Sequence, residues 1–498
     1  MLRNRFFILV LAIWLCMGNM FASVKIGDLF YELDDATQTA SVASCTDHSY
    51  YKLTSVTIPS SINYNDVTYT VTSIDGWIFG DNCRELESVS LPNSLIRIGE
   101  YAFSFCRSLT NVDIPNSVTE IGQYAFGEVP NVTYSGSATG APWGAHCLNG
   151  YVEGRLVYKD ESKTDLLICS YAETGDVVIP EGVVSIADWA FYACRIASVS
   201  IPSSVTSIGE SAFESCRDMT RLTINNSAAS IGNRAFLWCT QLTEAMLGAN
   251  ITSIGEGAFS ECYLLTGIVI PNSVTTIGKW AFWMCYAMTS VTLSNAITRI
   301  EEKTFAQCSK LENIVIPYGV TYIGEYAFSE CENLTHIEFS GSVTTIDESA
   351  FYNCPALTEV VLPNSVTSIG LSAFEDCTAL KNISLGSNLT HIGEGAFLYC
   401  PNVTTIINQV VTPQEITYFT FAHVNKSTCV LYVPKESIDL YKAAEVWKDF
   451  LQIEEIPVSK VSEDISIDAR NIRKQISNGH VFIESADKTY TISGQQMK

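Results

Sequence analysis

The sequence has few of the features that enzymes and nucleic-acid-binding proteins carry. It contains no nucleophile elbow, P-loop, H-E-x-x-H zinc helix or dinucleotide fingerprint, and its six histidines share no common spacing. Basic residues are scarce, since 29 lysines and arginines face 53 acidic residues and leave a formal net charge of -24, which repels phosphate backbones. We therefore expect no enzyme, no cofactor or metal site and no nucleic-acid partner.

Long apolar runs are also missing after the first residues. Arg3 and Arg5 precede an apolar run from Phe6 to Met17, and the small pair Ala22 and Ser23 follows, which is the pattern of a secretory signal peptide. The run is shorter than the roughly 20 apolar residues that cross a bilayer, and no later segment reaches about 18. The sequence predicts an exported chain, secreted or at the cell surface, with no transmembrane segment once the signal is removed.

One motif is repeated through most of the chain. An isoleucine precedes a phenylalanine by five residues, and this marker phenylalanine recurs every 23 residues over the best copies. The regular copies carry Phe213, Phe236, Phe259, Phe282, Phe305, Phe328, Phe351, Phe374 and Phe397, and looser copies carry Phe79, Phe103, Phe126, Phe191 and Phe421. A fixed period of this length indicates stacked units that complete one another's core. The sequence predicts a solenoid.

Each repeat contains the signals of one short strand. Residues Leu311 to Ile316 alternate as a strand with one buried face does, and Pro317 ends the strand because proline cannot donate to a ladder. After the turn, Glu325 to Ser329 has the pattern of a short helical or 3₁₀ segment. We therefore expect an α/β solenoid of about 14 repeats, with one parallel strand and one short helical segment in each, curved into a rod and interrupted by a β-hairpin.

Cysteine is abundant, but its spacing argues against disulfide bonds. Of the 17 cysteines, eleven lie three residues after a marker phenylalanine, one in each repeat. Parallel side chains on stacked turns keep neighbouring Cβ atoms about 4.8 Å apart, beyond the roughly 3.5 to 4.5 Å of a disulfide. No C-x-x-C or Cys/His cluster suggests a metal site. The sequence predicts a ladder of buried free thiols.

The repeat has the form LxxVxIPxxVxxIGxxAFxxC over roughly residues 50 to 456. This string resembles the BspA-like leucine-rich repeat proteins, a branch of the leucine-rich repeats found on bacterial and protist surfaces. The resemblance implies a curved solenoid with a parallel sheet on one side. It also implies display outside the cell and adhesion to proteins of a host or of neighbouring cells.

The breaks in the pattern divide the chain. We expect a signal peptide at 1–22, an N-terminal cap at 23–50, a first repeat segment at 51–127, an irregular insertion with a β-hairpin at 128–176, the main repeat array at 177–422, a C-terminal cap with a helix at 423–457, and a linker with a small β module at 458–498. The hairpin, within Leu156 to Ser170, is either a structural joint or a ligand-binding protrusion. In the cap, Leu440, Trp447 and Leu451 share one predicted helical face.

A row of acidic residues allows two chemical alternatives. Glu302, Glu325 and Glu348 each stand three residues before a marker phenylalanine. Carboxylates from neighbouring coils cleave polysaccharides in some β-helix enzymes, and a carboxylate stripe can hold Ca²⁺. A carboxylate at the start of a short helix is also favoured by the helix dipole. The dipole explains the row better than catalysis does.

Five aromatic residues form a candidate protein-binding patch: Trp238, Tyr263, Trp280, Trp283 and Tyr286. Most other repeats carry Ser, Glu, Asp or Asn at these positions, and stacking brings the five side chains within some 10 to 15 Å of one another. The patch is either an interface hot spot or a set of side chains that fold over the core.

The favoured function is non-catalytic binding of an extracellular or cell-surface protein, used in adhesion. The alternatives are a glycan-binding module, a passive structural spacer and, last, a polysaccharide-cleaving enzyme. The outward strand positions carry no aromatic platform for sugars, which lowers the glycan alternative; they are Thr223, Met246, Val269, Thr292, Val315, Glu338 and Val361.

Overall fold

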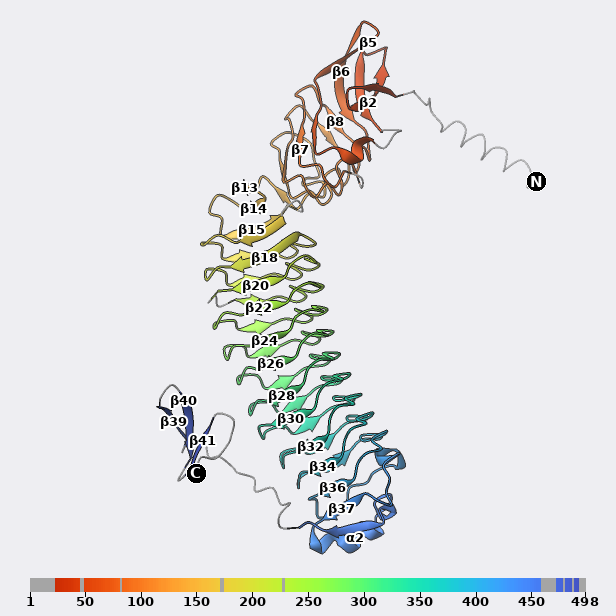
Figure 1. The fold of residues 1–498 in the computed structure, drawn as a ribbon. Coiled ribbons are helices and arrows are strands. Elements are labelled where there is room, and N and C mark those ends of the chain that lie inside the picture. Colours follow the sequence, from red (N-terminus) through yellow and green to blue (C-terminus); the bar gives the residue numbers. More distant parts are fainter. Residues whose placement is uncertain are drawn as a thin grey trace, which may run out of the picture.

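The computed structural model describes residues 23–44, 49–80, 83–170, 174–225, 229–457, 472–477, 480–485 and 488–491. The expected signal peptide and most of the expected linker lie outside these residues. The chain winds into a solenoid of about 16 stacked turns (Figure 1). The predicted solenoid is confirmed. It exceeds 14 turns partly because β37 (Val430–Val433) and β38 (Gln452–Glu455) continue the stack without a marker phenylalanine.

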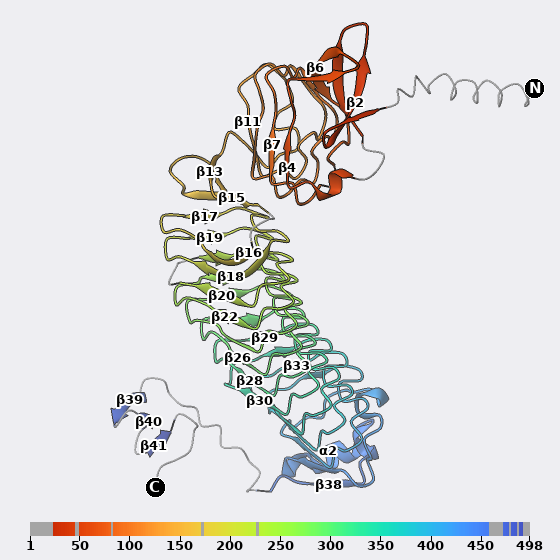
Figure 2. The same cartoon turned by 45° about the horizontal axis from the view of Figure 1, so that its top comes forward.

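Each regular turn supplies two parallel strands, where the sequence predicts one. The longer strands form the long-strand face of the coil: β4 (Ser55–Thr57), β7 (Ser88–Ser90), β9 (Asn111–Asp113), β11 (Asn131–Thr133), β16 (Thr174–Val178), β18 (Arg195–Ile201), β20 (Arg221–Ile224), β22 (Glu244–Met246), β24 (Gly267–Val269), β26 (Ser290–Thr292), β28 (Asn313–Ile316), β30 (His336–Phe339), β32 (Glu359–Val361), β34 (Asn382–Leu385), β36 (Thr405–Asn408), β37 and β38. Figure 2 shows these strands stacked along one side of the main array.

The second strand has only two residues and ends on the isoleucine that precedes the marker phenylalanine. These strands form the short-strand face: β8 (Arg97–Ile98), β10 (Glu120–Ile121), β17 (Ser185–Ile186), β19 (Ser207–Ile208), β21 (Ser230–Ile231), β23 (Ser253–Ile254), β25 (Thr276–Ile277), β27 (Arg299–Ile300), β29 (Tyr322–Ile323), β31 (Thr345–Ile346), β33 (Ser368–Ile369) and β35 (His391–Ile392). Gly324 follows β29 and is needed for close approach, because a Cβ there would lie 2.9 Å from the carbonyl carbon of Glu301.

The third side of the coil, from the glycine to the cysteine of each repeat, is the turn face. The helical segment predicted at Glu325 to Ser329 is wrong, because these residues form tight turns. In one turn, three alternate N–H groups donate to the next turn: Lys303 to the carbonyl of Glu325 at 2.9 Å, Phe305 to Ala327 at 2.8 Å and Gln307 to Ser329 at 2.7 Å. The N–H groups of residues 304, 306 and 308 close turns within the coil. Half of the backbone N–H groups that would donate within a helix therefore donate to the next turn instead.

A stack of phenylalanine rings fills the core. From Phe191 to Phe421 the successive ring centroids lie 4.6 to 5.5 Å apart, and every ring is fully buried. Trp447 packs on Phe421 at 5.4 Å and closes this stack at its C-terminal end. A separate stack runs from Phe79 to Phe126, with Tyr50 on its first ring at 5.3 Å.

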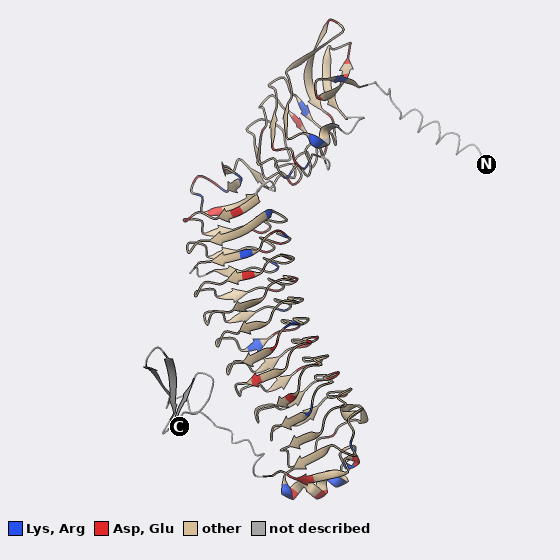
Figure 3. Ribbon diagram, in the orientation of Figure 1, with Lys and Arg blue, Asp and Glu red and all other residues tan. Residues whose placement is uncertain are grey.

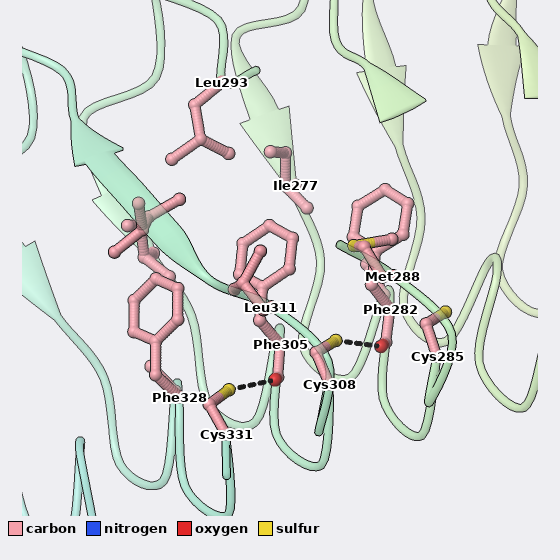
Figure 4. Close-up of a cluster of buried hydrophobic side chains, with 14 of the residues drawn as sticks. Ile277, Phe282, Cys285, Met288, Leu293, Phe305, Cys308, Leu311, Phe328 and Cys331 are labelled. Atoms are coloured by element: carbon pink, nitrogen blue, oxygen red, sulfur yellow. Dashed lines mark hydrogen bonds between the residues drawn. The ribbon is translucent and has the colours of Figure 1, made fainter. Parts of the chain in front are cut away.

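The cysteine ladder lies beside the rings. All eleven ladder cysteines are buried and free. Ten of them donate their thiol hydrogen to the carbonyl oxygen of the marker phenylalanine of the preceding turn, at 3.0 to 3.4 Å (Figure 4). Each sulfur therefore has a partner other than the neighbouring sulfur. That the thiols stay reduced in the exported protein remains a prediction.

A small antiparallel sheet precedes the first turns. Strands β1 (Val24–Ile26), β2 (Leu29–Asp34) and β3 (Thr39–Ala43) form a meander, and the 3₁₀ helix η1 (Ser49–Lys52) follows. The hairpin of β5 (Ser61–Tyr64) and β6 (Val67–Ile74) turns at Asn65 and Asp66, both with positive φ. Since β3 pairs in parallel with β6, the meander extends the sheet of the first turns.

The stack is interrupted between the two core clusters. After β12 (Cys147–Leu148), strands β13 (Tyr151–Glu153), β14 (Leu156–Tyr158) and β15 (Asp165–Cys169) form an antiparallel meander, which confirms the predicted hairpin. Strand β15 pairs with β17 and so begins the main array. The first core cluster ends at Ala145 and the second begins at Tyr158. Figure 1 shows the first segment tilted against the main array.

The C-terminal cap contains less helix than predicted. Helix α2 (Ile438–Ala443) is short, with the 3₁₀ helices η2 (Tyr418–Phe421), η3 (Lys435–Ser437) and η4 (Trp447–Asp449) nearby. The predicted apolar face is partly wrong: Trp447 is buried, but Leu440 and Leu451 are exposed. Because the chain leaves the helix at Ala444, Tyr441 and Phe450 take the inward positions instead.

Beyond the cap, β39 (Ile472–Ser477), β40 (His480–Ser485) and β41 (Lys488–Thr491) form an antiparallel sheet. No helix within the described ranges is long and apolar enough to cross a membrane. Figure 3 shows that most strands of the main array carry neither acidic nor basic residues. Most charged residues of the main array therefore lie in the turns between the strands.

Candidate functional site

The five residues of the aromatic patch come from three consecutive turns. Trp238, Trp280 and Trp283 lie on the turn face, and Tyr263 and Tyr286 directly follow the cysteines that end it. Trp238 comes from the turn of Phe236, Tyr263 from that of Phe259, and Trp280 from that of Phe282 together with Trp283 and Tyr286. The N–H of Trp238 donates to the carbonyl of Ser260 at 3.1 Å, and the N–H of Trp280 donates to the next turn at 2.9 Å. The ladder between turns thus fixes the backbone from which the aromatic side chains extend.

Three of the five residues line one pocket. Trp238, Trp280 and Trp283 surround a cavity of about 480 Å³, the tryptophan pocket, which Gly257 and Ser260 also line. Gly257 occupies the slot that holds Arg234 in the preceding turn and Trp280 in the following turn. A Cβ on Gly257 would meet nothing closer than 3.7 Å, so the space of the missing side chain is open. The pocket exists because a turn with two small residues lies between turns with large ones.

The other two residues form a separate pair. Tyr263 and Tyr286 stack with ring centroids 5.3 Å apart, and the Tyr263 hydroxyl donates to Oε2 of Glu261 at 2.6 Å. This hydrogen bond, with a smaller contribution from burial, raises the pKa of Tyr263 to about 12. Glu261 also lines the tryptophan pocket, so the tyrosine pair flanks it.

The exposure of the patch is intermediate. Trp238 is 37% exposed and Tyr286 is 39% exposed, while Trp280, Trp283 and Tyr263 are half-buried. None of the five belongs to the buried core cluster. The side chains therefore rest against the coil and still present aromatic surface to solvent.

The charged lining of the pocket is mostly acidic. Glu214, Glu256 and Glu261 contribute carboxylates, and Arg234 and Lys303 contribute cations. Glu214 is only 7% exposed, and its Oε2 has no hydrogen-bond partner. The sequence analysis missed Glu214, Gly257 and Ser260. A comparison of residue size slot by slot between neighbouring turns is the signal that would have found the pocket.

Comparison with known proteins settles the class of this solenoid. Residues 46–135, 169–289, 229–358 and 298–428 match the BspA type leucine rich repeat region, in six copies overall. The chain belongs to the BspA-type leucine-rich repeat family. No curated protein matches it. A search of solved structures finds a leucine-rich repeat protein from Bacteroides ovatus that is 25% identical, covers 83% of this chain and 100% of its own, and gives a TM-score of 0.53.

Two more distant structures have lower scores. A leucine rich cell surface protein from Faecalibacterium prausnitzii is 25% identical over 78% of this chain and 95% of its own, with a TM-score of 0.32. The pneumococcal vaccine antigen PcpA is 17% identical over 88% of this chain and 99% of its own, with a TM-score of 0.35. The BspA-type family consists of leucine-rich repeat proteins that generally act as non-enzymatic binding modules.

The long-strand face of this BspA-type chain offers a second surface. Met246, Val269, Val315 and Val361 are exposed there, and a shallow hollow over β22, β24 and β26 forms at Gly267. The residues that line this hollow include no aromatic ring on which a sugar would stack. Charged side chains interrupt the aliphatic residues of this face. Glu244 lines the hollow and lies 3.9 Å from Arg221, and Glu338 and Glu359 are exposed on β30 and β32.

In the acidic row of the BspA-type repeats, Glu302 has two lysine partners, and no helix follows any of the three residues. The dipole explanation is wrong, because no helix follows Glu302, Glu325 or Glu348. Lys279 lies 3.0 Å from the Glu302 carboxylate and, as the largest contribution, lowers its pKa; Lys303 lies 3.7 Å away on the other oxygen. Among the residues that the structure describes, no group of three or more His, Cys, Asp or Glu is placed to hold a metal ion.

Proposed function

We propose that this BspA-type protein is exported, displayed at the cell surface, and binds an extracellular protein without catalysis, in adhesion to a host or to neighbouring cells. The apolar run from Phe6 to Met17 supports export, and the family membership supports protein binding. The observation that carries the binding site is the tryptophan pocket on the turn face.

The pocket has the composition of an interface hot spot. Tryptophan, tyrosine and arginine are enriched among the residues that dominate binding energy in protein interfaces. Tryptophan and tyrosine supply large rigid contact surfaces at small entropic cost. Trp238, Trp280 and Trp283 concentrate such surface around one cavity, with Arg234 at its edge and the Tyr263–Tyr286 pair beside it. A passive spacer has no need of this concentration in three turns out of about 16.

A double substitution tests the proposal. Trp238→Ala with Trp283→Ala removes two walls of the pocket, and we expect it to abolish capture of extracellular-matrix or neighbouring-cell surface proteins. The matched control is Tyr352→Ala with Tyr399→Ala, because Tyr352 occupies the slot of Trp283 and Tyr399 that of Trp238 in other turns. The control should capture partners as the wild type does.

The circular dichroism melt of the double tryptophan variant decides how a loss of partner capture is interpreted. An unchanged melt with lost capture supports the proposal, since the residues then act at the surface. A large fall in melting temperature places the tryptophans in the core, and the binding surface moves to the long-strand face or to the meander β13–β15. Binding to carbohydrate arrays alone would replace protein by glycan as the ligand.

A further inference from the structure

We infer that the tryptophan pocket takes a cationic side chain, lysine or arginine, presented by the partner, with Glu214 as its buried counter-charge. This inference rests on the proposed function and names the chemistry that the pocket recognises. It is carried by one buried carboxylate and by the aromatic walls around it.

Glu214 is the main observation. Glu214 is 7% exposed, and its Oε2 atom is buried without a hydrogen-bond partner. A buried carboxylate that lacks a partner costs free energy, and a cation bound beside it would offset that cost. Glu375 occupies the same slot in another turn, where it is half-buried and lines no tryptophan pocket. The burial of Glu214 is therefore specific to this turn and not a property of the slot.

The remaining lining favours a positive charge. Glu256 and Glu261 add two carboxylates to that of Glu214. Tryptophan faces attract cations through the ring quadrupole, and this attraction grows when the cation leaves water. Three tryptophans and three carboxylates around one cavity suit an ammonium or guanidinium group better than a neutral hydroxyl. A hydroxyl would satisfy the hydrogen bond of Glu214 and leave its charge uncompensated.

Two cationic side chains of the protein itself, Lys303 and Arg234, also line the pocket. They differ in whether they have partners outside the cavity. Lys303 lies 3.7 Å from Glu302 and 5.2 Å above the ring of Tyr326, so it is engaged outside the cavity. Arg234 is exposed and lies at the edge of the pocket, in the slot of Gly257 but one turn earlier. It opposes an incoming cation, and its removal should strengthen binding.

The test uses the exported chain and small probes of defined charge. Nα-acetyl-lysine methylamide and Nα-acetyl-arginine methylamide are titrated by ligand-observed NMR against the neutral norleucine and citrulline analogues and against a panel of neutral disaccharides. The variants are Glu214→Gln, the matched control Glu375→Gln, and Arg234→Ala. Gly257→Trp fills the cavity and tests the site independently, should Glu214→Gln fail to fold.

We expect the cationic probes to bind roughly tenfold more tightly than their neutral analogues, and Glu214→Gln to lose that margin. Glu375→Gln should bind as the wild type does, Arg234→Ala more tightly, and Gly257→Trp not at all.

Three results would overturn the inference: equal binding of charged and neutral probes, cation binding that survives Glu214→Gln, or no cation binding up to about 10 mM. Disaccharide binding lost in Gly257→Trp would make the pocket a glycan site. If Glu214→Gln captures the protein partner while the double tryptophan variant does not, the cation inference fails and the proposed function stands.

Discussion

At the scale of the residue, two slots in each regular turn, from that of Phe213 to that of Phe397, hold left-handed backbone. They lie two residues before and two residues after the marker phenylalanine, as in Lys303 (φ 51°) and Gln307 (φ 60°). This conformation turns the N–H of each slot toward the next turn, where it finds a carbonyl. Where the slots are left-handed they hold no valine, isoleucine or threonine, whose branched side chains clash there. Trp238 and Trp280 occupy such slots and are held by them.

Asn353 tests this requirement, since its φ is 52° and it lies outside the pocket. Asn353→Val should lower the free energy of unfolding by roughly 1 to 3 kcal/mol, because valine tolerates left-handed backbone poorly. Asn353→Gly, the control, should change it little, because glycine has no Cβ to clash. Urea unfolding of both variants is the measurement, and equal stability of the two would contradict the account.

The buried thiols predict a loss of stability at high pH. Burial raises the pKa of the Cys308 thiol well above its ordinary value, with a smaller contribution from Cys285, and burial raises that of Cys400 to about 12. Above about pH 8.5 the unfolded chain loses thiol protons that the folded chain keeps, so stability falls as pH rises. Each thiol contributes about 1.4 kcal/mol per pH unit in this window, and none below it.

Urea titrations between pH 7 and 10 measure this slope. Cys308→Ala is the comparison variant, and its slope should be shallower than that of the wild type by the contribution of one thiol. Thiol counting under denaturing, non-reducing conditions tests the premise that the ladder is reduced. Recovery of fewer than half of the eleven ladder thiols would refute it.

At the scale of the element, the sequence of a repeat predicts which residues are buried but does not predict the backbone conformation of the turn face. The positions of Ile316, Phe328 and Cys331 are predictable because side-chain periodicity records burial, and the structure buries all three. The turn face is not predictable in the same way. A run such as Glu325 to Ser329 fits a helix by composition, and only the neighbouring turn, with its unpaired carbonyls, draws the N–H groups outward.

The tryptophan pocket was partly predictable for a related reason. The five aromatic residues stand out within single repeats, and the sequence places them in one region. The cavity itself depends on Gly257. This glycine leaves a cavity only because the same slot holds the large residues Arg234 and Trp280 in the adjacent turns. Likewise, Glu375 occupies the same slot as Glu214 and is only half-buried, so the burial of Glu214 could not be predicted from its own repeat.

At the scale of the whole molecule, the rod contains two cores and not one. The clusters ending at Ala145 and beginning at Tyr158 meet through polar contacts. Ser170 donates to the carbonyl of Ser108 at 3.2 Å, and Arg155 pairs with Glu87 at 3.3 Å. Such a joint couples the segments weakly, since exposed ion pairs and single hydrogen bonds contribute little.

We therefore expect two unfolding transitions. Phe103→Ala should lower the stability of the first segment by roughly 3 to 5 kcal/mol and leave the second unchanged, and Phe305→Ala should do the reverse. In the main array, Phe305→Ala should raise hydrogen exchange first in the neighbouring turns, because the stability of a solenoid comes from each repeat and its contacts with its nearest neighbours. A single transition that both variants shift equally, or exchange raised uniformly along the array, would contradict the two-core account.

The central claim is that this solenoid binds through a cavity left by one missing side chain. Gly257→Trp fills that cavity with the side chain that Trp280 already carries in the same slot of the next turn. Gly395→Trp is the matched control, because Gly395 lies in the same slot with a φ of 66°, close to the 60° of Gly257, and lines no tryptophan pocket. Both variants therefore pay a similar backbone cost of roughly 1 to 2 kcal/mol.

The most direct measurement is the affinity of both variants for an extracellular protein that the wild type captures and that has been purified. The account predicts that Gly257→Trp loses binding while Gly395→Trp binds as the wild type does, with equal melting temperatures for the two variants. Wild-type affinity in a folded Gly257→Trp variant would contradict it.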